Sequence, residues 1–341
     1  MAVVPTRQLG KNGPQVSAIG FGAMTLSFPP LSSASDDERF KIIDRAIELG
    51  CTYIDSADVY GDNEELFARY FKKYPHQRKK VFFATKFANI FANNQISVRG
   101  DAQYVREASA KSFKRLELDQ IDLYYVHRID KNIPIEETMS VLKELVQVGK
   151  VKYLGLSECS SDTLRRAHAV HPISAVQVEY SPFSLEIEHA DIGLLKTCRE
   201  LGVAIVCYSP LGRGMLTGQI KSPNDLDKDD RRRHFPRFSE ENFPKNIQLV
   251  NKLASIAQKK GCTSGQLTLA WILAQGNDFI PIPGTTKIKN LEENAAAAQI
   301  KLSKEDIAEI RQACESADIA GNRYPEAFAV ALYGDSAPKK K

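Results

Sequence analysis

The sequence predicts an α/β fold of the (β/α)8 or TIM barrel class, with a β-hairpin before the barrel and extra helices after it. Eight short strand-like runs alternate with helical patterns, and such alternation is typical of a parallel sheet with right-handed crossovers. The runs lie near residues 19, 53, 82, 123, 154, 177, 205 and 281. The eight units therefore occupy roughly 250 residues, the usual size of such a barrel.

A doubly wound sheet is the alternative for the same alternation. It would favour a Gly-x-Gly-x-x-Gly turn between the first strand and the first helix. Here Gly20-Phe21-Gly22 is followed by Ala23-Met24-Thr25 and then by a stretch rich in serine and proline. This third observation favours the barrel.

One domain is predicted over residues 1–341, made of an N-terminal hairpin at 6–17, the barrel at about 18–298 and a C-terminal extension at 299–341. Asn12-Gly13 predicts the hairpin turn because both residues tolerate positive φ. The first barrel strand, residues 18–22, is rich in glycine, which indicates that another group approaches its backbone closely.

The helices are predicted from apolar residues at helical spacing and from start and stop signals. In the first helix, Phe40, Ile43 and Ile47 share one face and Gly50 ends the pattern. Ser303, with Asp306 three residues later, caps the last helix. The expected helices cover residues 36–50, 64–74, 101–116, 135–148, 161–170, 190–201, 246–275, 291–298 and 303–317.

Residues 211–245 interrupt the alternation, and their prolines and charges predict a long loop with short helices at most. A loop after the seventh strand can cover the barrel mouth. Its run Arg231-Arg232-Arg233-His234 is interpreted as solvated loop rather than as a phosphate site. We expect the loops at 28–35, 87–100, 128–134 and 215–245 to shape the substrate site.

The composition limits the classes of function. The 341 residues include 46 basic and 42 acidic side chains, and the formal charge of +4 favours neither nucleic acid nor a membrane surface as a partner. The six cysteines form no Cys-x-x-Cys pair and indicate a reducing compartment. The sequence shows neither a signal-peptide core nor a membrane-spanning run, and its lysine tail is interpreted as a solvated end, so a cytoplasmic protein is expected.

Four residues at strand ends predict acid–base chemistry. Asp55 and Tyr60 follow the second strand, Lys86 ends the third and His127 ends the fourth. A free tyrosine, with a pKa of about 10, is a poor acid or base at neutral pH. A lysine ammonium beside the phenol lowers the tyrosine pKa, and an aspartate holds that lysine in place. The set can donate a proton to a carbonyl oxygen that His127 positions.

Two other classes of barrel enzyme could use residues of these types. A metal-dependent hydrolase would use several His and Asp ligands at strand ends, whereas His127 is the one histidine predicted there and the sequence contains no His-x-His. A Schiff-base aldolase could use Lys86, but a lysine beside Asp55 stays charged and is a poor nucleophile.

Several motifs, in order from about Arg7 to about Ala298, resemble those of the aldo-keto reductases. They are Asp55-Ser56-Ala57-x-x-Tyr60, Thr85-Lys86, the strand ending in His127, Gly155-Leu156-Ser157, Gln177-Val178-Glu179-Tyr180, Tyr208-Ser209-Pro210-Leu211-Gly212, and Ile282-Pro283-Gly284-Thr285 followed by Glu293-Asn294. The chain looks most like the fungal and bacterial branch that reduces aldehydes such as pyridoxal and aromatic aldehydes.

The resemblance implies a nicotinamide coenzyme across the barrel mouth, with Tyr60 as proton donor, Asp55 and Lys86 as its tuners and His127 as carbonyl positioner. It implies that Ser157 and Gln177 hold the carboxamide, Tyr208 stacks on the nicotinamide, and Gly22 and Met24 line its reacting face. Ser209, Leu211 and Arg213 would approach the pyrophosphate. The adenosine end would lie against Gly284, Thr285, Thr286, Lys287, Asn290, Glu293 and Asn294.

Two positions depart from the family pattern. Glu158 stands where an asparagine is usual, and an ionised carboxylate can only accept hydrogen bonds, so we expect it to take the carboxamide NH2 hydrogens. Asn290 stands where many members have arginine or glutamine. Lys287 and Lys289 are the nearby cations for a 2′-phosphate.

The sequence therefore predicts reduction of an aldehyde or ketone with NADPH, NADH being the weaker candidate. The expected partner is a small carbonyl compound, with neither nucleic acid nor a membrane, and the expected assembly is a monomer or weak homo-oligomer. The alternative is a coenzyme-binding sensor with slow turnover, as in auxiliary subunits of potassium channels that resemble this family.

Overall fold

Eight parallel strands form the barrel in the computed structural model, which describes residues 3–28, 33–92, 95–329 and 331–339. Their order is β3 (Phe21–Gly22), β4 (Tyr53–Asp55), β5 (Phe82–Phe87), β8 (Ile121–Val126), β9 (Val151–Ser157), β10 (Ala175–Glu179), β11 (Ala204–Tyr208) and β12 (Phe279–Pro281). The N–H of Gly20 donates to Pro281 O at 2.9 Å and that of Gly22 to Pro283 O at 3.3 Å. These bonds join the first and last strands, and the predicted barrel is confirmed.

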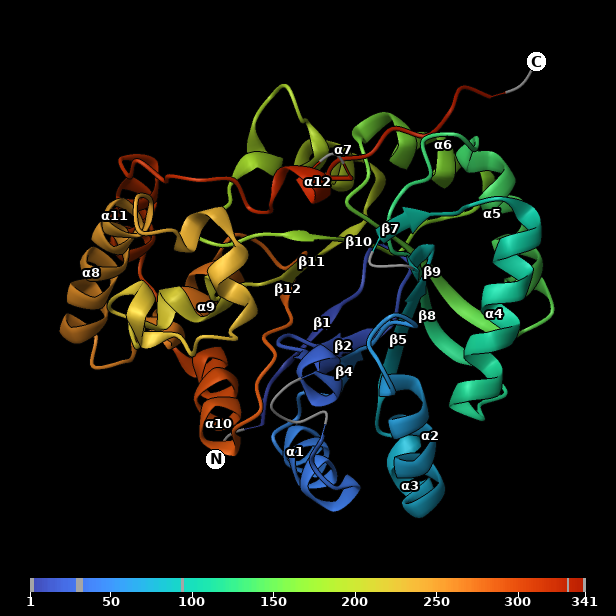
Figure 1. Ribbon diagram of the computed structural model, residues 1–341, viewed down its shortest axis with the longest axis horizontal. Helices are drawn as coiled ribbons and strands as arrows, with labels where there is room; N and C mark the ends of the chain where they lie inside the picture. Colours follow the sequence, from blue (N-terminus) through green and yellow to red (C-terminus); the bar gives the residue numbers. More distant parts are fainter. Residues whose placement is uncertain (1–2, 29–32, 93–94, 330, 340–341) are drawn as a thin grey trace.

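Helices surround the sheet (Figure 1). They are α1 (Asp36–Glu48), α2 (Asn63–Lys73), α3 (Pro75–Arg78), α4 (Ala102–Leu116), α5 (Ile135–Gln147), α6 (Ser161–Val170), α7 (Leu194–Leu201), α8 (Phe243–Lys259), α9 (Ser264–Ala274), α10 (Ile288–Ala296), α11 (Lys304–Glu315) and α12 (Glu326–Ala329). Helix α1 shows why they form: Ser35 and Glu38 make a reciprocal cap, and Phe40, Ile43 and Ile47 are buried on the face toward the barrel.

The predicted N-terminal hairpin pairs β1 (Thr6–Gln8) with β2 (Gln15–Ser17) in antiparallel register. Arg7 fixes it to the barrel, because its guanidinium donates to the backbone carbonyls of Leu273, Gly276 and Phe279 at 2.6–3.0 Å. The hairpin thus packs near the start of β12. The predicted site lies at the opposite, carboxyl ends of the strands.

Two predicted segments differ from the structure. Residues 87–100, expected as loop, contain the hairpin β6 (Asn89–Ala92) and β7 (Gln95–Val98). The single helix expected at 246–275 is two helices, because Gly261 adopts a left-handed φ of 66° and Thr263 caps a new helix. The loop after β11 matches its prediction, with the 3-10 turns η4 (Gly212–Thr217), η5 (Pro223–Asp225), η6 (Arg231–His234) and η7 (Pro236–Phe238).

The segment after α11 crosses the molecule from α8 and α11, past α12, toward α5 and α6 (Figure 1). Gly334 N–H donates to Glu158 O at 2.7 Å and Ser160 N–H to Gly334 O at 3.0 Å, directly after β9. Arg166 in α6 donates to Ala337 O at 2.8 Å. The C-terminal segment therefore lies on the carboxyl ends of the strands.

Parts of three expected features lie outside the described residues: positions 29–32 of the loop at 28–35, positions 93–94 of the loop at 87–100, and Lys340 and Lys341 of the tail. Across the described ranges, every helix is too short or too polar to cross a membrane.

Candidate active site

A buried lysine occupies the centre of the predicted site. Lys86, in β5, is fully buried, and its Nζ donates to Asp55 Oδ1 at 2.5 Å and to Ser56 O at 2.7 Å. The two strands are neighbours, so Asp55 at the end of β4 faces β5. Burial lowers the pKa of Lys86, but the charge of Asp55 and the Tyr60 hydroxyl raise it more, and the net pKa is raised. Lys86 is therefore a permanent cation.

Tyr60 lies in the loop between β4 and α2, partly exposed, with its ring centroid 5.0 Å from Lys86 Nζ. Burial raises the pKa of Tyr60, while the charge of Lys86 lowers it and that of Asp55 raises it again. Lys86 thus acts in the predicted direction, but burial outweighs it and the net pKa of Tyr60 is raised. A phenol with this pKa keeps its proton at neutral pH, as a proton donor must.

His127, at the end of β8, completes the set. Its ring stands 5.8 Å from that of Tyr60 at an angle of 84°. Burial, with the charges of Lys86 and Arg128, holds the pKa of His127 well below its usual value. Its buried Nδ1 has no hydrogen-bond partner within the described chain. A neutral imidazole beside the phenol can donate one N–H to a carbonyl oxygen.

Gln177 lies in the middle of β10 and Ser157 at the end of β9, in the strands where the sequence predicts them. Gln177 Nε2 donates to Asp55 Oδ2 at 2.7 Å, so the carboxylate is held by both Lys86 and Gln177. Ser157 Oγ accepts a bond of 3.2 Å from Arg128. Gln177 thus supports Asp55 in this structure, a role that the sequence does not predict.

Glu158 is fully buried, and its carboxylate contacts protein groups alone within the described chain. It accepts bonds from Arg323 at 3.1 and 3.3 Å, from the Tyr208 hydroxyl at 2.7 Å and from Glu179 N–H at 3.2 Å. Burial raises the pKa of Glu158, but Arg323 and Arg128 lower it below its usual range. Three of these bonds end on Oε1 and one on Oε2, so Oε2 is the oxygen left to accept from a carboxamide, and that role of Glu158 stays a prediction.

Arg323 is the group that sequence reasoning missed. The signal was available, since a glutamate inside the barrel needs a cation and the C-terminal segment contains an arginine. Nothing in the linear spacing joins positions 158 and 323, however, and the contact exists only because the segment folds back over β9.

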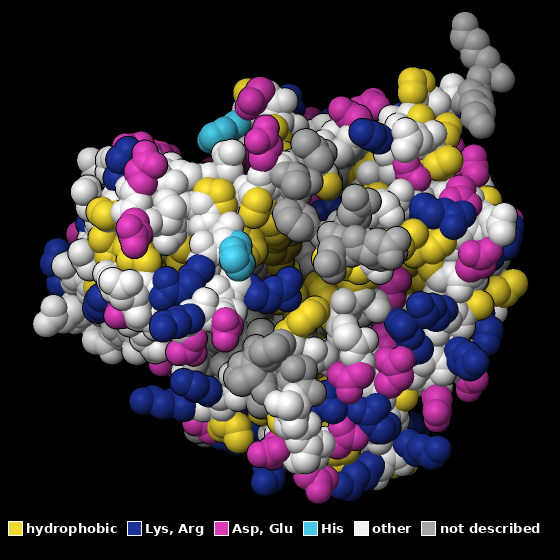
Figure 2. Space-filling model, viewed as in Figure 1, with side chains coloured by type: hydrophobic (Ala, Val, Ile, Leu, Met, Phe, Trp, Pro, Cys, Tyr) yellow, Lys and Arg dark blue, Asp and Glu magenta, His cyan; other side chains and the backbone are white. Residues whose placement is uncertain are grey.

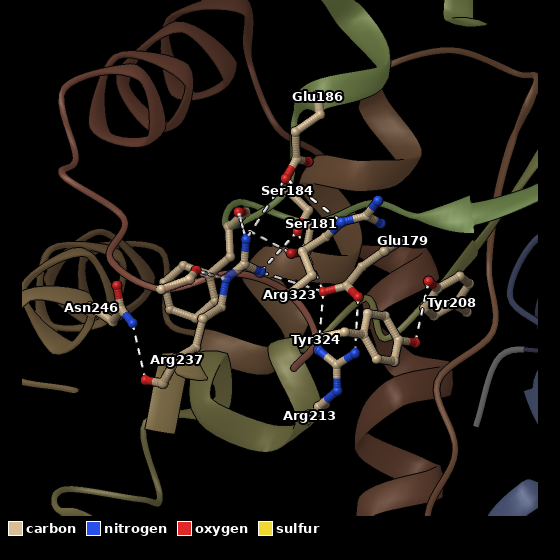
Figure 3. A network of polar contacts seen from close by, with 12 residues as sticks. Glu179, Ser181, Ser184, Glu186, Tyr208, Arg213, Arg237, Asn246, Arg323 and Tyr324 are labelled. Carbon is tan, nitrogen blue, oxygen red and sulfur yellow. Dashed lines mark hydrogen bonds and ion pairs between the residues drawn. The ribbon is translucent and has the colours of Figure 1, made fainter. Parts of the chain in front are cut away.

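A network of ion pairs joins Glu179 and Glu186 to three arginines, Arg213, Arg237 and Arg323 (Figure 3). Glu179, fully buried at the end of β10, accepts two bonds from Arg213 at 3.0 and 3.1 Å and one from Arg237 at 3.4 Å. The Arg213 guanidinium lies 4.4 Å from the Phe235 ring centroid and 4.7 Å from that of Tyr324. The Arg213 side chain, expected near a pyrophosphate, is paired with Glu179 instead.

The backbone after β11 forms a tight turn, in which Ser209, Gly212, Arg213 and Gly214 have φ values of 48°, 55°, 55° and 95°. Gly212 N–H donates to Ser209 O and Gly214 N–H to Leu211 O, both at 2.9 Å, so these two groups are bonded within the turn. Leu211, also on the predicted list, lies inside this turn. The turn follows the seventh strand of the barrel, a position at which barrels commonly bind phosphate.

The loop and helix after β12 lie beside this turn. A Cβ built on Gly265 of α9 would lie 3.8 Å from Leu211 and 3.4 Å from Glu293, which places both predicted segments beside the N-terminal end of α9. Thr285 Oγ1 accepts from Lys287 N–H at 3.1 Å just before α10, Asn294 is buried within α10, and Thr286, Lys287 and Asn290 remain accessible. Glu293 accepts from the Thr263 hydroxyl at 2.7 Å.

Close contact with the segment at and after the last strand explains why the first strand is rich in glycine. A Cβ on Gly22 would lie 2.7 Å from Ile282 O, and one on Gly284 would lie 2.6 Å from Gly22 O. Both glycines are therefore required by close backbone packing between the first and last strands. Met24, just beyond, is 44% exposed.

The face in Figure 2 is hollowed near its middle, with hydrophobic, basic and histidine side chains at the border of the hollow. Among the described residues, no cluster of three His, Cys, Asp or Glu side chains has the arrangement to hold a metal ion.

Sequence comparisons with known proteins point to a single family. Residues 18–315 match the model of the aldo/keto reductase family. "Aldo-keto reductase str7" of Strobilurus tenacellus is 54% identical over 325 residues, which cover 94% of this chain and 95% of the relative. "Aldo-keto reductase yakc [NADP(+)]" of Schizosaccharomyces pombe is 48% identical over 344 residues and 99% of each chain.

Solved structures that resemble this fold come from the same family. The aldo-keto reductase AKR11C1 of Bacillus halodurans, in its holo form, superposes with a TM-score of 0.76 at 25% identity over 94% of this chain and 98% of its own. A thermostable aldo-keto reductase, Tm1743, in complex with the inhibitor epalrestat, gives a TM-score of 0.71 at 29% identity over 90% and 99% of the two chains. The chain belongs to the aldo/keto reductase family and is an oxidoreductase of that family.

Proposed function

We propose that the protein reduces an aldehyde or ketone to the alcohol with NADPH, and that Tyr60 donates the proton to the carbonyl oxygen. The observation that carries the proposal is the buried Lys86–Asp55 pair, with Lys86 5.0 Å from the centre of the Tyr60 ring. The phenol keeps its proton at neutral pH, and the fixed cation stabilises the phenolate that is left when the proton moves. His127, neutral, supplies an N–H to the same oxygen.

The coenzyme, when bound, supplies a hydride to the carbonyl carbon. This chain's own residues fit its two charged parts: the turn at 209–214, after the seventh strand, has the position of a barrel phosphate site for the pyrophosphate, and the exposed Lys287 and Lys289 fit a 2′-phosphate. Tyr208, partly exposed at the end of β11, provides a flat ring for the nicotinamide. The name of the yeast relative states NADP(+), which supports NADPH over NADH here.

The substrate side of the mouth carries apolar groups. Met24 is 44% and Phe91 60% exposed, and the ring of Phe28 lies 6.4 Å from that of Tyr60. Exposed apolar groups beside a reacting phenol favour an uncharged, ring-bearing substrate over a sugar. We therefore propose an aromatic aldehyde or pyridoxal as the substrate class to test first.

The test is a titration of the protein with NADPH and with NADH, followed by protein fluorescence, and then by the loss of NADPH absorbance with a panel of aldehydes that includes pyridoxal. We expect tighter binding of NADPH and turnover of at least one aldehyde. Binding with no turnover across the panel would favour the sensor alternative. Failure of both coenzymes to bind would contradict the proposal.

A further inference from the structure

The hydroxyl of Tyr208 belongs to a chain of hydrogen bonds that starts in the C-terminal segment. Tyr324 donates to the Tyr208 hydroxyl at 3.3 Å (Figure 3). Tyr208 in turn donates to Glu158 Oε1 at 2.7 Å. Arg323 binds both oxygens of the same carboxylate, at 3.1 and 3.3 Å. Two neighbouring residues of the segment therefore hold one tyrosine, Tyr324 directly and Arg323 through Glu158.

The ring of Tyr208 lies at the mouth of the barrel. Tyr208 is the last residue of β11, and its ring packs against the apolar cluster inside the barrel, which includes Val206 and Ile282. The side chain remains partly exposed. Its backbone is fixed in the strand and its hydroxyl is fixed by two hydrogen bonds, so rotation of the ring about the Cα–Cβ bond would break both. The ring is thus held at both ends.

The backbone of Glu158 is held by the same segment. Its φ of 50° is left-handed, a conformation that asparagine adopts more readily than glutamate. Such a conformation persists only where neighbouring groups hold it, and it is commoner at functional sites. Here Glu158 N–H donates to Gln177 O at 3.0 Å, and Gly334 N–H donates to Glu158 O at 2.7 Å. The C-terminal segment therefore fixes both the backbone and the carboxylate of Glu158.

This chain of hydroxyls lies within electrostatic reach of the reacting groups. Burial raises the pKa of Tyr60 and Lys86 lowers it, and Tyr324 is among the smaller contributors that raise it. Burial lowers the pKa of Arg128, whereas Tyr208 and Tyr324 raise it. The C-terminal segment thus places a residue at the site, beside the ring that Tyr208 presents.

We propose that Arg323 and Tyr324 are positioning residues for the coenzyme, which fix the ring of Tyr208 for stacking on the nicotinamide. This inference rests on the proposed function, in which Tyr208 provides the flat surface for that ring. Stacking depends on the orientation of both rings. A tyrosine that is already fixed loses little freedom when the coenzyme binds, which favours binding. Arg323 and Tyr324 act on the coenzyme through Tyr208, so the C-terminal segment is part of the nicotinamide site.

The test compares two ligands by isothermal titration calorimetry: NADPH, and 2′-phospho-ADP-ribose, the part of NADPH that lacks the nicotinamide. We expect Tyr324→Phe to weaken NADPH binding by roughly three- to tenfold, the worth of one hydrogen bond between uncharged groups. Tyr208→Phe should weaken it at least as much. Arg323→Lys keeps the charge without the two-point contact and should act in the same direction. All three variants should bind the nicotinamide-free fragment as the wild type does.

Two further variants are the controls. Tyr333 lies in the same segment, and its buried hydroxyl has no hydrogen-bond partner among the described residues. Tyr333→Phe should therefore change the affinity for neither ligand. Tyr208→Phe combined with Tyr324→Phe should bind NADPH no more weakly than Tyr208→Phe alone, because the Tyr324 hydroxyl then lacks the group through which it acts.

Three outcomes would overturn the proposal. An equal loss of affinity for NADPH and for the fragment would show that these residues serve the fold or the rest of the coenzyme. Additive losses in the double variant would show that Tyr324 acts without Tyr208. Unchanged NADPH affinity in the single variants would show that the ring needs no support. If the wild type binds neither ligand, the proposed function itself fails before the positioning residues are tested.

The wild type alone gives a second test, which covers variants that do not fold. Coupling between two sites is reciprocal, so a bound nicotinamide must stabilise the segment that positions Tyr208. Gly334 N–H, bonded to Glu158 O, reports on that segment. Its hydrogen exchange should be slower with saturating NADPH than with the saturating fragment, by roughly the same three- to tenfold. Equal protection by the two ligands would contradict the inference.

Discussion

At the scale of single residues, the site depends on one buried ion pair. Lys86 is completely buried and Asp55 is 3% exposed, so neither charge has solvent to compensate it. Each is held by a further neutral contact, Lys86 by Ser56 O and Asp55 by Gln177. Such a pair fixes the position of the cation beside Tyr60 and makes its removal costly.

Lys86→Met should therefore lower both turnover and the free energy of unfolding, each for its own reason. Turnover should fall by roughly a hundred- to ten-thousandfold, because the phenolate loses its cation. The unpaired Asp55 should also lower the free energy of unfolding by about 3–5 kcal/mol. The control is Asp55→Asn with Lys86→Met, measured by urea unfolding and steady-state kinetics. It should recover most of the stability and little of the activity; recovery of both would contradict the electrostatic role.

The pH dependence tests the state of His127. Since burial and two neighbouring cations hold its pKa well below the usual value, the imidazole stays neutral from pH 6 to 8. We expect kcat/KM for an aldehyde without titratable groups to show no inflection near pH 6.5, the usual histidine pKa. His127→Gln, which keeps a donor, should be slower with the same flat profile. An inflection near pH 6.5 that His127→Gln removes would show that the imidazole titrates.

The four central residues could be predicted to lie together because each lies at the end of a strand or in the loop directly after it, and parallel strands bring such ends together. The role of Glu158 could not, because the side chain that fixes it lies 165 positions further along the chain. The net pKa of Tyr60 could not be predicted from the sequence either, since it depends on how far burial offsets the charge of Lys86.

At the scale of elements, the loop between β4 and α2 contains an acidic residue whose ionised form lowers the stability of the folded state. Asp58 lies two residues before Tyr60, and its buried Oδ1 has no hydrogen-bond partner within the described ranges. Burial, followed by the charge of Glu64, raises the pKa of Asp58 to about 7. Well below pH 4 the carboxyl is protonated in both the folded and the unfolded chain. As pH rises toward 7, the unfolded chain releases this proton first, so the folded state loses stability across that window.

Asp58→Asn should remove this cost. We expect it to raise the free energy of unfolding at pH 8 by on the order of 1–2 kcal/mol, allowing for partial exposure, and by less at pH 4.5. Asp62→Asn is the control in the same loop. Burial raises the pKa of Asp62, but hydrogen bonds and ion pairs with Ser27, Arg39 and Arg69 lower it more, so its replacement should destabilise at pH 8. A gain from Asp58→Asn that does not change with pH would contradict the assignment.

The elements themselves were largely predictable, because helices such as α6 (Ser161–Val170) have both a cap and an apolar face in the sequence. The hairpin β6–β7 was missed since its strands are four residues each and it pairs with itself outside the barrel. The break between α8 and α9 was missed although the sequence marks it, because Gly261 is a stop signal and Thr263 with Gln266 forms a capping box for α9.

At the scale of the whole molecule, the C-terminal segment closes the structure over the strand ends. Arg323 and Glu158 are 5% and 0% exposed and join this segment to β9, and Tyr324 donates to the Tyr208 hydroxyl at 3.3 Å. The sequence predicts this extension but not where it lies, because no periodic pattern marks the contact.

Arg323→Met should lower the free energy of unfolding by about 3–5 kcal/mol, because Glu158 is left buried and charged. Arg323→Met combined with Glu158→Gln should recover most of that loss, since both charges are then absent. Urea unfolding of the two variants checks this. If the single variant is as stable as the wild type, the ion pair does not hold the segment in place.

The proton-donor role of Tyr60 is tested most directly by Tyr60→Phe, measured for NADPH affinity by fluorescence and for aldehyde turnover in the same preparation. The variant removes one oxygen and leaves the Lys86–Asp55 pair intact. We expect turnover to fall by roughly a hundred- to ten-thousandfold while the dissociation constant of NADPH stays nearly unchanged. Turnover close to that of the wild type would show that another group delivers the proton.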